Sequence, residues 1–280
     1  MGWHRQILDA VSRVGAVRLS ALGLDTSGRR ALSSLVAQGY LERSGKVVCS
    51  PDVSEPVKAA VRVGGLVTCG EAMSFYGLPD LVHNDVPHVA VPANRGRTSF
   101  EGVVVHREQG LVPGQDLVVS PARLAARLLR CAPAKEAIAV VDRILHQELA
   151  TREEIAVHLR GNRYCAKARR LLARCSERSR SILESFARIE LEDAGMQAVP
   201  GVDVPGVGEI DLLVEGRVDV ETDGYAFHSE RSAWRKDRWR DQQLLARGLI
   251  PLRLTYDDVM TGQTVPIVTA VLASWEDKRR

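Results

Sequence analysis

The chain has 280 residues, which is long enough for two domains or three small ones with substantial buried cores. An apolar content of 45% and a charged content of 26% are typical of a soluble globular protein. The net charge of +3 permits a nucleic-acid partner without establishing one, because binding depends on where the basic residues cluster. No stretch approaches about 18 consecutive apolar residues, and the N-terminus has no apolar segment of the signal-peptide type. We therefore expect a cytoplasmic protein without a membrane partner.

The cysteines and histidines do not follow a metal-ligand pattern. The five cysteines are scattered, with no C-x-x-C pair: Cys49, Cys69, Cys131, Cys165 and Cys175. An odd number of dispersed thiols fits a reducing cytoplasm and predicts no zinc site. The histidines of the middle region also lack the spacing of metal ligands: His83, His88 and His106. We expect these histidines to have ordinary surface or hydrogen-bonded roles.

Residues 1–56 are predicted to form a winged helix-turn-helix. Helices are expected at about 3–14, 19–22 and 28–38, followed by a short hairpin at 40–48. In such a domain the third helix enters the major groove of DNA, and Arg29 and Arg30 stand near its start. Two alternatives stay open: any compact three-helix module shows this pattern and can bind protein, and arginines at a helix start are commonly just solvated.

Residues 57–165 are predicted to form a small α+β middle region. The expected elements are a helix at 66–78, strands at 88–91 and 103–106, and helices from 121, at 134–147 and at 152–159. Ser120 and Pro121 predict the start of one helix, since serine caps helices and proline suits the first helical position. The segment 161–181 is rich in arginine and lysine, and is either a solvated helical face or a contact to a phosphate backbone.

Residues 176–280 are predicted to form an α/β sandwich with a mixed sheet. The expected order is a helix from 181, a strand at 199–204, a hairpin at 208–223, a helix at 231–247, a strand at 249–256 and a helix from 257 to 275. Glu184 lies at the edge of the buried stripe of the first helix. The helix at 231–247 is basic, and we expect it to contact DNA through Arg235, Lys236, Arg238 and Arg240.

The hairpin at 208–223 gathers acidic residues. A three-residue loop at 215–217 would pair Val214 with Val218 and place Asp211 opposite Glu221. Asp219 and Asp223 would then flank Glu221 on the same face. Like charges facing each other across two strands repel. Converging carboxylates are therefore best explained by a divalent metal, and their hard oxygen atoms suit Mg²⁺ or Mn²⁺.

These residues resemble a known family of nucleases. The series from Val218 to Gly248, VDVETDG…H…D.R.R…L…G, together with Glu184 and Asp211, resembles the Vsr-like branch of the PD-(D/E)xK nuclease superfamily. More narrowly, the chain resembles actinobacterial proteins that join an AbiEi-type antitoxin winged helix to such a domain. The middle segments GEAMSFYGL, VPHVAVP, GVVVHR and VSPARLAARLL match that architecture in order. The resemblance thus covers nearly the whole chain and implies a restriction-endonuclease-like fold at the C-terminus.

The resemblance also implies metal-dependent hydrolysis of phosphodiester bonds. Its catalytic residues would be Glu184, Asp211, Glu221, Asp223 and His228. Asp211 and Glu221 would hold Mg²⁺ or Mn²⁺, with Glu184 as a further ligand. His228 would act as acid or base, and Asp237 would contact the metal ligands without contacting the metal itself. The chain departs from the family pattern at Asp223, which stands where the superfamily has a lysine, and Lys236 is a weaker substitute.

Each of these assignments has a plainer alternative. Asp211 and Glu221 can be ion-pair partners of Arg217 or Arg253, and Asp223 with Gly224 can be only a turn. His228 can be a structural hydrogen-bonding residue. Asp237 can pair within its own helix.

Two functions follow from these assignments. The first is a Mg²⁺-dependent DNA endonuclease or nickase that the winged helix directs to DNA. The second is a catalytically inactive DNA-binding regulator of the antitoxin type. A homodimer or a toxin-like partner protein fits either function.

Overall fold

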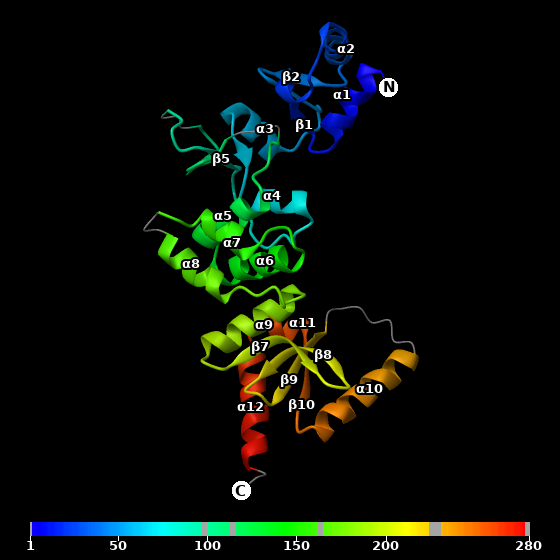
Figure 1. Ribbon diagram of the computed structural model, residues 1–280, viewed down its shortest axis with the longest axis vertical. Helices are drawn as coiled ribbons and strands as arrows, with labels where there is room; N and C mark the ends of the chain where they lie inside the picture. The colour runs from blue at the N-terminus through cyan, green and yellow to red at the C-terminus, as the bar shows by residue number, and fades with distance from the viewer. Residues whose placement is uncertain (1, 97–99, 113–115, 162–164, 224–230, 278–280) are drawn as a thin grey trace. The chain divides into compact units, whose positions relative to one another are not determined.

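The computed structural model describes residues 2–96, 100–112, 116–161, 165–223 and 231–277, with the side chains of 223–236 and 276–277 left out (Figure 1). The chain divides into two compact units. The first comprises Met1–Ala132 and Glu153–Cys165, and the second comprises Pro133–Arg152 and Ala166–Arg280. These units do not coincide with the predicted domains 1–56, 57–165 and 176–280, and the three-domain division stays a prediction. No helix of the described part of the chain is long and apolar enough to cross a membrane.

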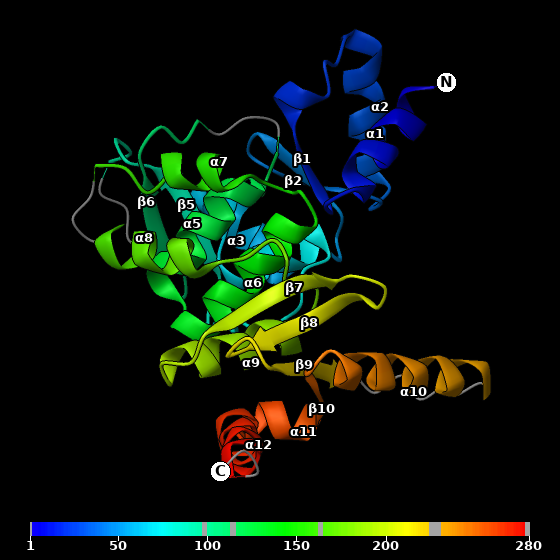
Figure 2. The same cartoon turned by 60° about the horizontal axis from the view of Figure 1, so that its bottom comes forward.

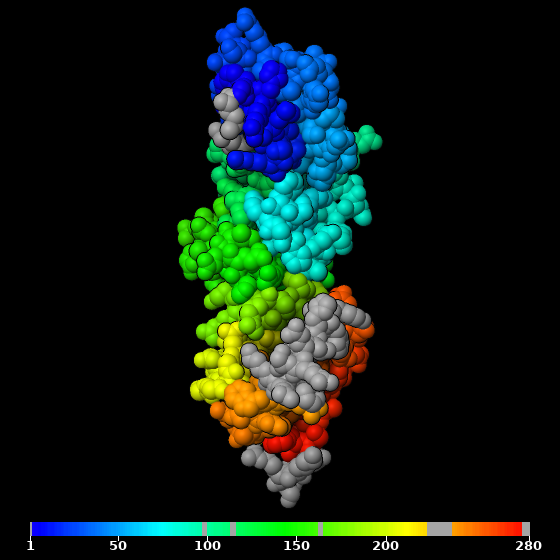
Figure 3. Space-filling model, turned by 90° about the vertical axis from the view of Figure 1, so that its right-hand side faces the viewer, coloured from blue at the N-terminus to red at the C-terminus, as the bar shows by residue number. Residues whose placement is uncertain are grey.

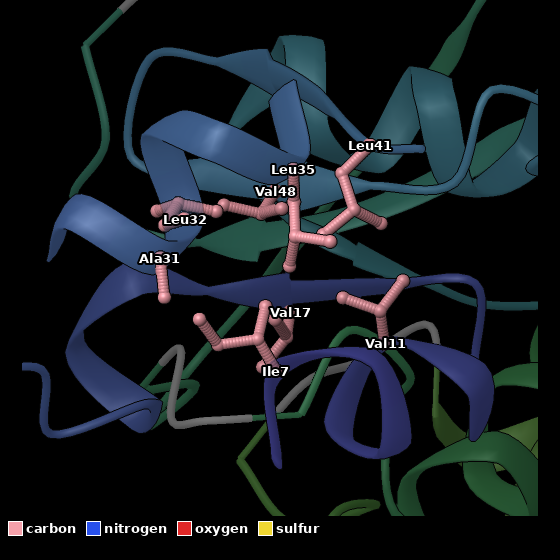
Figure 4. Close-up of a cluster of buried hydrophobic side chains, with 8 residues drawn as sticks. All are labelled: Ile7, Val11, Val17, Ala31, Leu32, Leu35, Leu41 and Val48. Carbon is pink, nitrogen blue, oxygen red and sulfur yellow. The ribbon is translucent and has the colours of Figure 1, made fainter. Parts of the chain in front are cut away.

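The N-terminal part of the first unit packs two helices on a small antiparallel sheet. Its elements are α1 (Trp3–Ser12), β1 (Ala16–Arg18), the 3-10 turn η1 (Leu19–Ala21), α2 (Thr26–Ala37), β2 (Glu42–Ser44) and β3 (Val47–Cys49), with strand order β1-β3-β2. Asp25 caps α2, because its carboxylate accepts a hydrogen bond from the Gly28 N–H at 2.7 Å. The helices and strands share one apolar core (Figure 4): Ile7, Val11, Val17, Ala31, Leu32, Leu35, Leu41 and Val48. The helices and the hairpin were predicted, whereas strand β1 was not.

The remainder of the first unit is built on a second small sheet. Its elements are α3 (Glu55–Val63), β4 (Leu66–Val67), α4 (Gly70–Met73), the 3-10 turn η2 (Ser74–Tyr76), β5 (His88–Pro92), β6 (Val104–Glu108), α5 (Pro121–Cys131) and most of α7 (Arg152–Val157). Strand β5 lies between β4, which is antiparallel to it, and β6, which is parallel to it. The predicted start of α5 is confirmed, with Ser120 in the capping position and Pro121 first in the helix.

The second unit contains a four-stranded mixed sheet in the order β10-β9-β8-β7. Its elements are α6 (Ala134–His146), most of α8 (Cys165–Arg174), α9 (Ile182–Asp193), β7 (Ala198–Val204), β8 (Gly208–Val214), β9 (Val218–Asp223), α10 (Arg231–Ala246), β10 (Ile250–Thr255), α11 (Tyr256–Met260) and α12 (Thr264–Asp277). Helix α9 packs against β7, β8 and β9, and α10 connects β9 to the parallel strand β10 (Figure 2). A parallel pair needs such a crossover, which a tight turn cannot provide.

Two predicted elements are wrong in detail, and one helix was not predicted. The single helix expected at 66–78 is instead strand β4 followed by two short helical segments, because Cys69 has a positive φ of 58° that ends any regular helix there. The single helix expected at 257–275 is two helices, separated at Gly262 with a φ of +74°. Helix α3 had no counterpart in the prediction, although Ser54 and Pro56 mark its start.

A buried ion pair joins α6 to α9 within the second unit. The Arg188 guanidinium donates to Asp142 at 2.8 Å, and the two side chains are 2% and 0% exposed. Asp142 also accepts hydrogen bonds from the Ser185 hydroxyl and the Ser176 N–H, each at 2.7 Å. Every oxygen of this carboxylate therefore has a donor, which is the condition for a buried charge to be tolerated. Because of this network α6 belongs with the C-terminal sheet.

We expect Asp142→Ala to lower the free energy of unfolding by about 3–5 kcal/mol, because it leaves the Arg188 charge buried without its partner. The double variant Asp142→Leu with Arg188→Met should cost less than Asp142→Ala alone, since it leaves no charge unpaired. Urea unfolding followed by circular dichroism measures both effects.

The matched control is Glu177→Gln, which removes an ion pair to Arg152 whose side chains are 64% and 36% exposed. Its effect should stay below about 1 kcal/mol. If Asp142→Ala and Glu177→Gln lower the free energy of unfolding equally, the buried ion pair does not hold α6 to α9.

Candidate active site and DNA interface

The hairpin of β8 and β9 has the register that the sequence predicts. Val214 pairs with Val218, and Leu212 pairs with Val220. Residues 215–217 form the loop, in which the Arg217 N–H donates to the Val214 carbonyl at 2.9 Å. Both Glu215 (φ 50°) and Gly216 (φ 62°) are left-handed. Two left-handed residues in succession turn the chain sharply enough to keep the strands in this register.

This register puts Asp211, Asp219 and Glu221 on one face of the hairpin. Asp211 and Glu221 occupy the next opposed positions beyond the Leu212–Val220 pair, so their side chains share a face. Asp211 also accepts a hydrogen bond from the Thr222 N–H at 3.2 Å. Asp219 lies two residues before Glu221 and therefore faces the same side. The opposite face of both strands is apolar and fully buried, formed by Ile210, Leu212, Val214, Val218 and Val220.

The Asp211 carboxylate is ion-paired with Arg180, which precedes helix α9. The Arg180 guanidinium donates to Asp211 at 2.8 Å and lies 3.2 Å from Glu209. The backbone N–H of Arg180 donates to Glu184 at 2.8 Å. Burial raises the pKa of Glu184, and the nearby Asp211 charge raises it further. Glu184 and Asp211 thus lie close enough to interact, with Arg180 contacting both.

The Glu221 carboxylate is held by two arginines from different elements. Arg240 of α10 contacts it at 2.9 Å, and Arg253 of β10 contacts it at 3.3 Å. Arg253 also reaches Asp241 at 3.0 Å, and Arg240 donates to the Glu209 carbonyl at 2.7 Å. The ion pair of Glu221 with Arg253, an alternative raised from the sequence, is therefore present. The positive charges offset part of the repulsion among the acids.

Asp219 is the acid that has no partner among the described residues. Its side chain is fully buried, and neither carboxylate oxygen has a hydrogen-bond donor in the part of the chain that the structure describes. Burial, followed by the charges of Glu221 and Asp211, raises the pKa of Asp219 to about 7, although Arg240 opposes the rise. A buried carboxylate without a donor is costly, because it has lost its water and gained nothing in exchange. The Asp219 carboxylate would therefore be stabilised by binding either a proton or a cation.

The acids do not form a closed cation cage. Among the described residues, no three of these carboxylates bring their oxygen atoms within 4.8 Å of one another. Asp211 and Glu221 direct oxygens at arginines, so a cation would have to displace at least one guanidinium. The donor chemistry fits Mg²⁺ or Mn²⁺, since all the candidates are hard oxygen ligands on one face.

Helix α10 adds basic and aromatic side chains beside the hairpin. In Figure 3 the orange atoms of α10 lie against the yellow atoms of the preceding strands. Asp237, Arg238 and Trp239 are exposed on this helix. Three side chains predicted for the site fall outside the described part: Asp223, Arg235 and Lys236. His228 also lies outside the described residues.

Arg29 and Arg30 are both exposed on the first turns of α2. Arg29 and Ser33 of this helix line a hollow together with Arg43 of strand β2. Arg29 and Arg43 therefore reach the same hollow, one from helix α2 and the other from strand β2. This arrangement provides positive charge next to the exposed start of a helix, which suits a phosphate backbone.

Two groups that shape the acidic face were missed as site residues. Arg180 stands in the basic segment 161–181, which was predicted as a solvated helical face or a contact to a phosphate backbone, and its partner Asp211 is 31 residues away. Asp219 was predicted to share the face of Glu221, but its complete burial has no local signal. The sequence signal for the shared face was the alternation of β9, in which Asp219 and Glu221 lie on either side of Val220.

No family profile matches the chain. It is distantly similar to two uncharacterized proteins of Mycobacterium tuberculosis: MT2308 of strain CDC 1551 / Oshkosh and Rv2248 of strain ATCC 25618 / H37Rv. Each is 29% identical over 213 residues, covering 70% of this chain and 76% of the relative. The crystal structure of the RV2827C protein from Mycobacterium tuberculosis aligns with 61% of this chain and 76% of that chain, at 15% identity and a TM-score of 0.35.

The pKa of Asp219, raised to about 7 from an ordinary value near 3.8, makes the stability of the metal-free protein depend on pH. Because the folded state holds this proton more tightly than the unfolded state, the stabilisation is complete below about pH 4 and is lost as the pH rises to about 7. Between about pH 4 and pH 7, the free energy of unfolding of Asp219→Asn relative to the wild type should increase by roughly 1.4 kcal/mol for each unit of rising pH. Urea unfolding in EDTA at several pH values measures the gain.

The control is Asp203→Asn, which changes an exposed acid in β7 of the same sheet. The difference in unfolding free energy between Asp203→Asn and the wild type should change less with pH than that of Asp219→Asn, because the Asp203 side chain is exposed and keeps its water on folding. Parallel pH profiles for the wild type and Asp219→Asn would contradict the proposed protonation.

Proposed function

We propose that the protein is a Mg²⁺- or Mn²⁺-dependent DNA endonuclease or nickase, directed to DNA by its N-terminal winged helix. The observation that carries this proposal is the set of carboxylates on one face of the β8–β9 hairpin, one of which is buried without a partner among the described residues. An acidic face of this kind has little value in a purely structural sheet, because like charges destabilise it. The resemblance to the Vsr-like nucleases supports the same chemistry. The helices and β1-β3-β2 sheet in the N-terminal part of the first unit support the winged helix.

Asp211, Glu221 and Glu184 would hold the metal, and the Asp219 carboxylate would lie beside Glu221 on the same face of the hairpin. A bound metal of this kind polarises the phosphate and lowers the pKa of a water molecule. Arg180 would release Asp211 to the metal and turn its guanidinium towards the phosphate. This exchange needs no change in the backbone, because Arg180 also hydrogen-bonds Glu184 through its main chain.

Arg240 takes the place of the lysine that the chain lacks at Asp223. Its guanidinium already lies 2.9 Å from Glu221, beside the face that would receive the scissile phosphate. A guanidinium offers two parallel N–H donors to a phosphate and keeps its charge at any physiological pH. Arg253 supports Glu221 from the neighbouring strand. His228 and Asp237 remain proposed as acid or base and as a supporting residue.

Arg29 and Arg30 of α2 would bring the protein to DNA, with Arg43 on the wing contacting the phosphate backbone. The basic residues of α10, Arg235, Lys236, Arg238 and Arg240, would contact the duplex near the cleaved bond. These contacts are mainly electrostatic, so binding should weaken steeply with salt.

A DNA-binding regulator of the antitoxin type is the second candidate, with a cognate toxin-like protein or a second copy as its partner. The observation in its favour is that Asp211 and Glu221 are already neutralised by arginines. A sheet in which ion pairs have replaced metal would keep its fold and lose its activity. The absence of lysine at Asp223 points the same way.

We expect the purified protein to nick or cut plasmid DNA only when Mg²⁺ or Mn²⁺ is present. Asp211→Asn and Glu221→Gln should abolish this activity, because each removes a charged ligand, while DNA binding persists. Agarose gels follow cleavage, and fluorescence anisotropy follows binding.

The control for cleavage is Asp193→Asn, which should cut at the wild-type rate because Asp193 stands at the opposite end of α9 from Glu184, paired with Arg174. A wild type that binds DNA but cuts none of the mismatched, nicked, modified or single-stranded substrates would favour the regulator. Metal-dependent cleavage that survives in both Asp211→Asn and Glu221→Gln would exclude the acidic face as the site of cleavage.

Arg29→Ala and Arg30→Ala should each weaken DNA binding about equally for all sequences if the arginines contact phosphates. The slope of log K against log salt should fall by about 1 for each phosphate contact that a substitution removes. Anisotropy titrations over a range of NaCl concentrations measure this slope. The control is Arg5→Ala on α1, an exposed arginine 3.9 Å from Asp9. If Arg5→Ala and Arg29→Ala have the same effect, α2 is not the DNA-binding helix.

A further inference from the structure

Three potential metal ligands meet in the first unit, away from the acidic hairpin. The Cys69 Sγ lies 3.5 Å from the His106 Nε2, which lies 3.1 Å from the His88 Nδ1. All three ligand atoms lie within 4.8 Å of one another. Within the described part of the chain, this is the one group of three or more histidine, cysteine or acidic side chains so closely gathered.

The small sheet positions these side chains. In the parallel pair of β5 and β6, His88 lies opposite Val104 and Ala90 lies opposite His106. His88 and His106 therefore project from the same face, two positions apart. The Thr68 N–H donates to the His88 carbonyl at 3.2 Å, which brings the next residue, Cys69, to the same place.

The backbone at Cys69 is held in an uncommon conformation. Its φ of 58° and ψ of −143° lie outside the regions that a residue with a side chain normally adopts. The following Gly70 is packed so tightly that a Cβ there would stand 1.8 Å from the Val82 carbonyl oxygen. Such strain persists only where the surroundings impose it, and it is concentrated at functional sites. Here it fixes a buried thiol, only 2% exposed, against two imidazoles.

The separations match a tetrahedral zinc ion. Zinc bonds of about 2.0–2.1 Å to nitrogen and about 2.3 Å to sulfur, at tetrahedral angles, separate two nitrogen ligands by about 3.3 Å and a sulfur and a nitrogen by about 3.6 Å. The observed separations are 3.1 Å between the nitrogens and 3.5 Å between Cys69 and His106. Hydrogen bonds alone explain this arrangement less well. The Nε2 of His106 faces both Cys69 and His88, and one ring nitrogen cannot be a donor and an acceptor at the same time.

A second thiol stands next to the group. Cys131, the exposed last residue of α5, interacts with Cys69, and its thiol donates to the Arg127 carbonyl at 2.9 Å. Arg127 is itself paired with the buried Glu108 at 2.5 Å, which offsets its charge. Two thiolates and two neutral imidazoles would neutralise a divalent ion and complete four ligands.

We propose that Cys69, His88 and His106, with Cys131 as the fourth ligand, form a structural zinc site in the first unit. The ion would join the strand pair β5–β6 to the segment after β4 and to the end of α5. It would lock the strained Cys69 backbone and stabilise the second small sheet of this unit. This proposal is independent of the proposed nuclease activity.

The full chain, purified from cells grown with zinc, should contain about one zinc per chain by elemental mass spectrometry. Cys69→Ser and His106→Gln should reduce this content to near zero. Removal of zinc by a strong chelator should lower the unfolding temperature of the wild type but leave that of Cys69→Ser unchanged. Co²⁺ added to the metal-free protein should give the thiolate charge-transfer and tetrahedral ligand-field bands.

The matched controls are Cys49→Ser and His83→Gln. Cys49 is a buried cysteine of β3, and His83 is an exposed histidine 3.5 Å from Asp80. Both variants should keep full zinc content. The proposal is overturned if the wild type holds no zinc and gives no thiolate–cobalt band, or if Cys69→Ser and Cys49→Ser hold equal amounts. It is also overturned if the reduced, metal-free chain unfolds at the same temperature with and without added zinc.

Discussion

The register of the β8–β9 hairpin is the constraint on which the candidate active site depends. Two left-handed residues, Glu215 and Gly216, close the loop so that Val214 meets Val218. A slip of one residue would send every apolar side chain of one strand to the acidic face and every acid into the core. The core valines and leucines therefore specify the position of the acids, since the apolar face tolerates no other register. The acidic face follows from the packing of the opposite one.

Collecting acids on one face has an electrostatic cost, and three elements outside the hairpin offset it. Arg180 comes from the segment before α9, Arg240 from α10 and Arg253 from β10. The face is therefore assembled only when the whole second unit is folded. Helix α9, which carries Glu184, is held in turn by the buried pair of Arg188 with Asp142 on α6. The position of the acids thus depends on a helix that the sequence assigned to the middle region.

The sequence predicts those features that local patterns determine. The hairpin register follows from period-two alternation and a glycine-containing loop, and α9 follows from the apolar residues at helical spacing after Ser181. Features that depend on distant partners were not predictable. The ligands Cys69 and His106 are 37 residues apart and match no spacing rule, because the three-stranded sheet β4-β5-β6 brings them together. The burial of Asp219 is equally non-local.

The arginines on the acidic face bear on both proposed functions. In the metal-free state they do what a cation would do, which is to neutralise Asp211 and Glu221. Among the described residues they leave Asp219 without a partner, and its raised pKa is the residual cost of the arrangement. A sheet that had exchanged metal for permanent ion pairs would gain stability from replacing this last acid with an apolar residue. The presence of Asp219 in a fully buried position is therefore better explained by a cation that binds nearby, which favours the enzyme over the regulator.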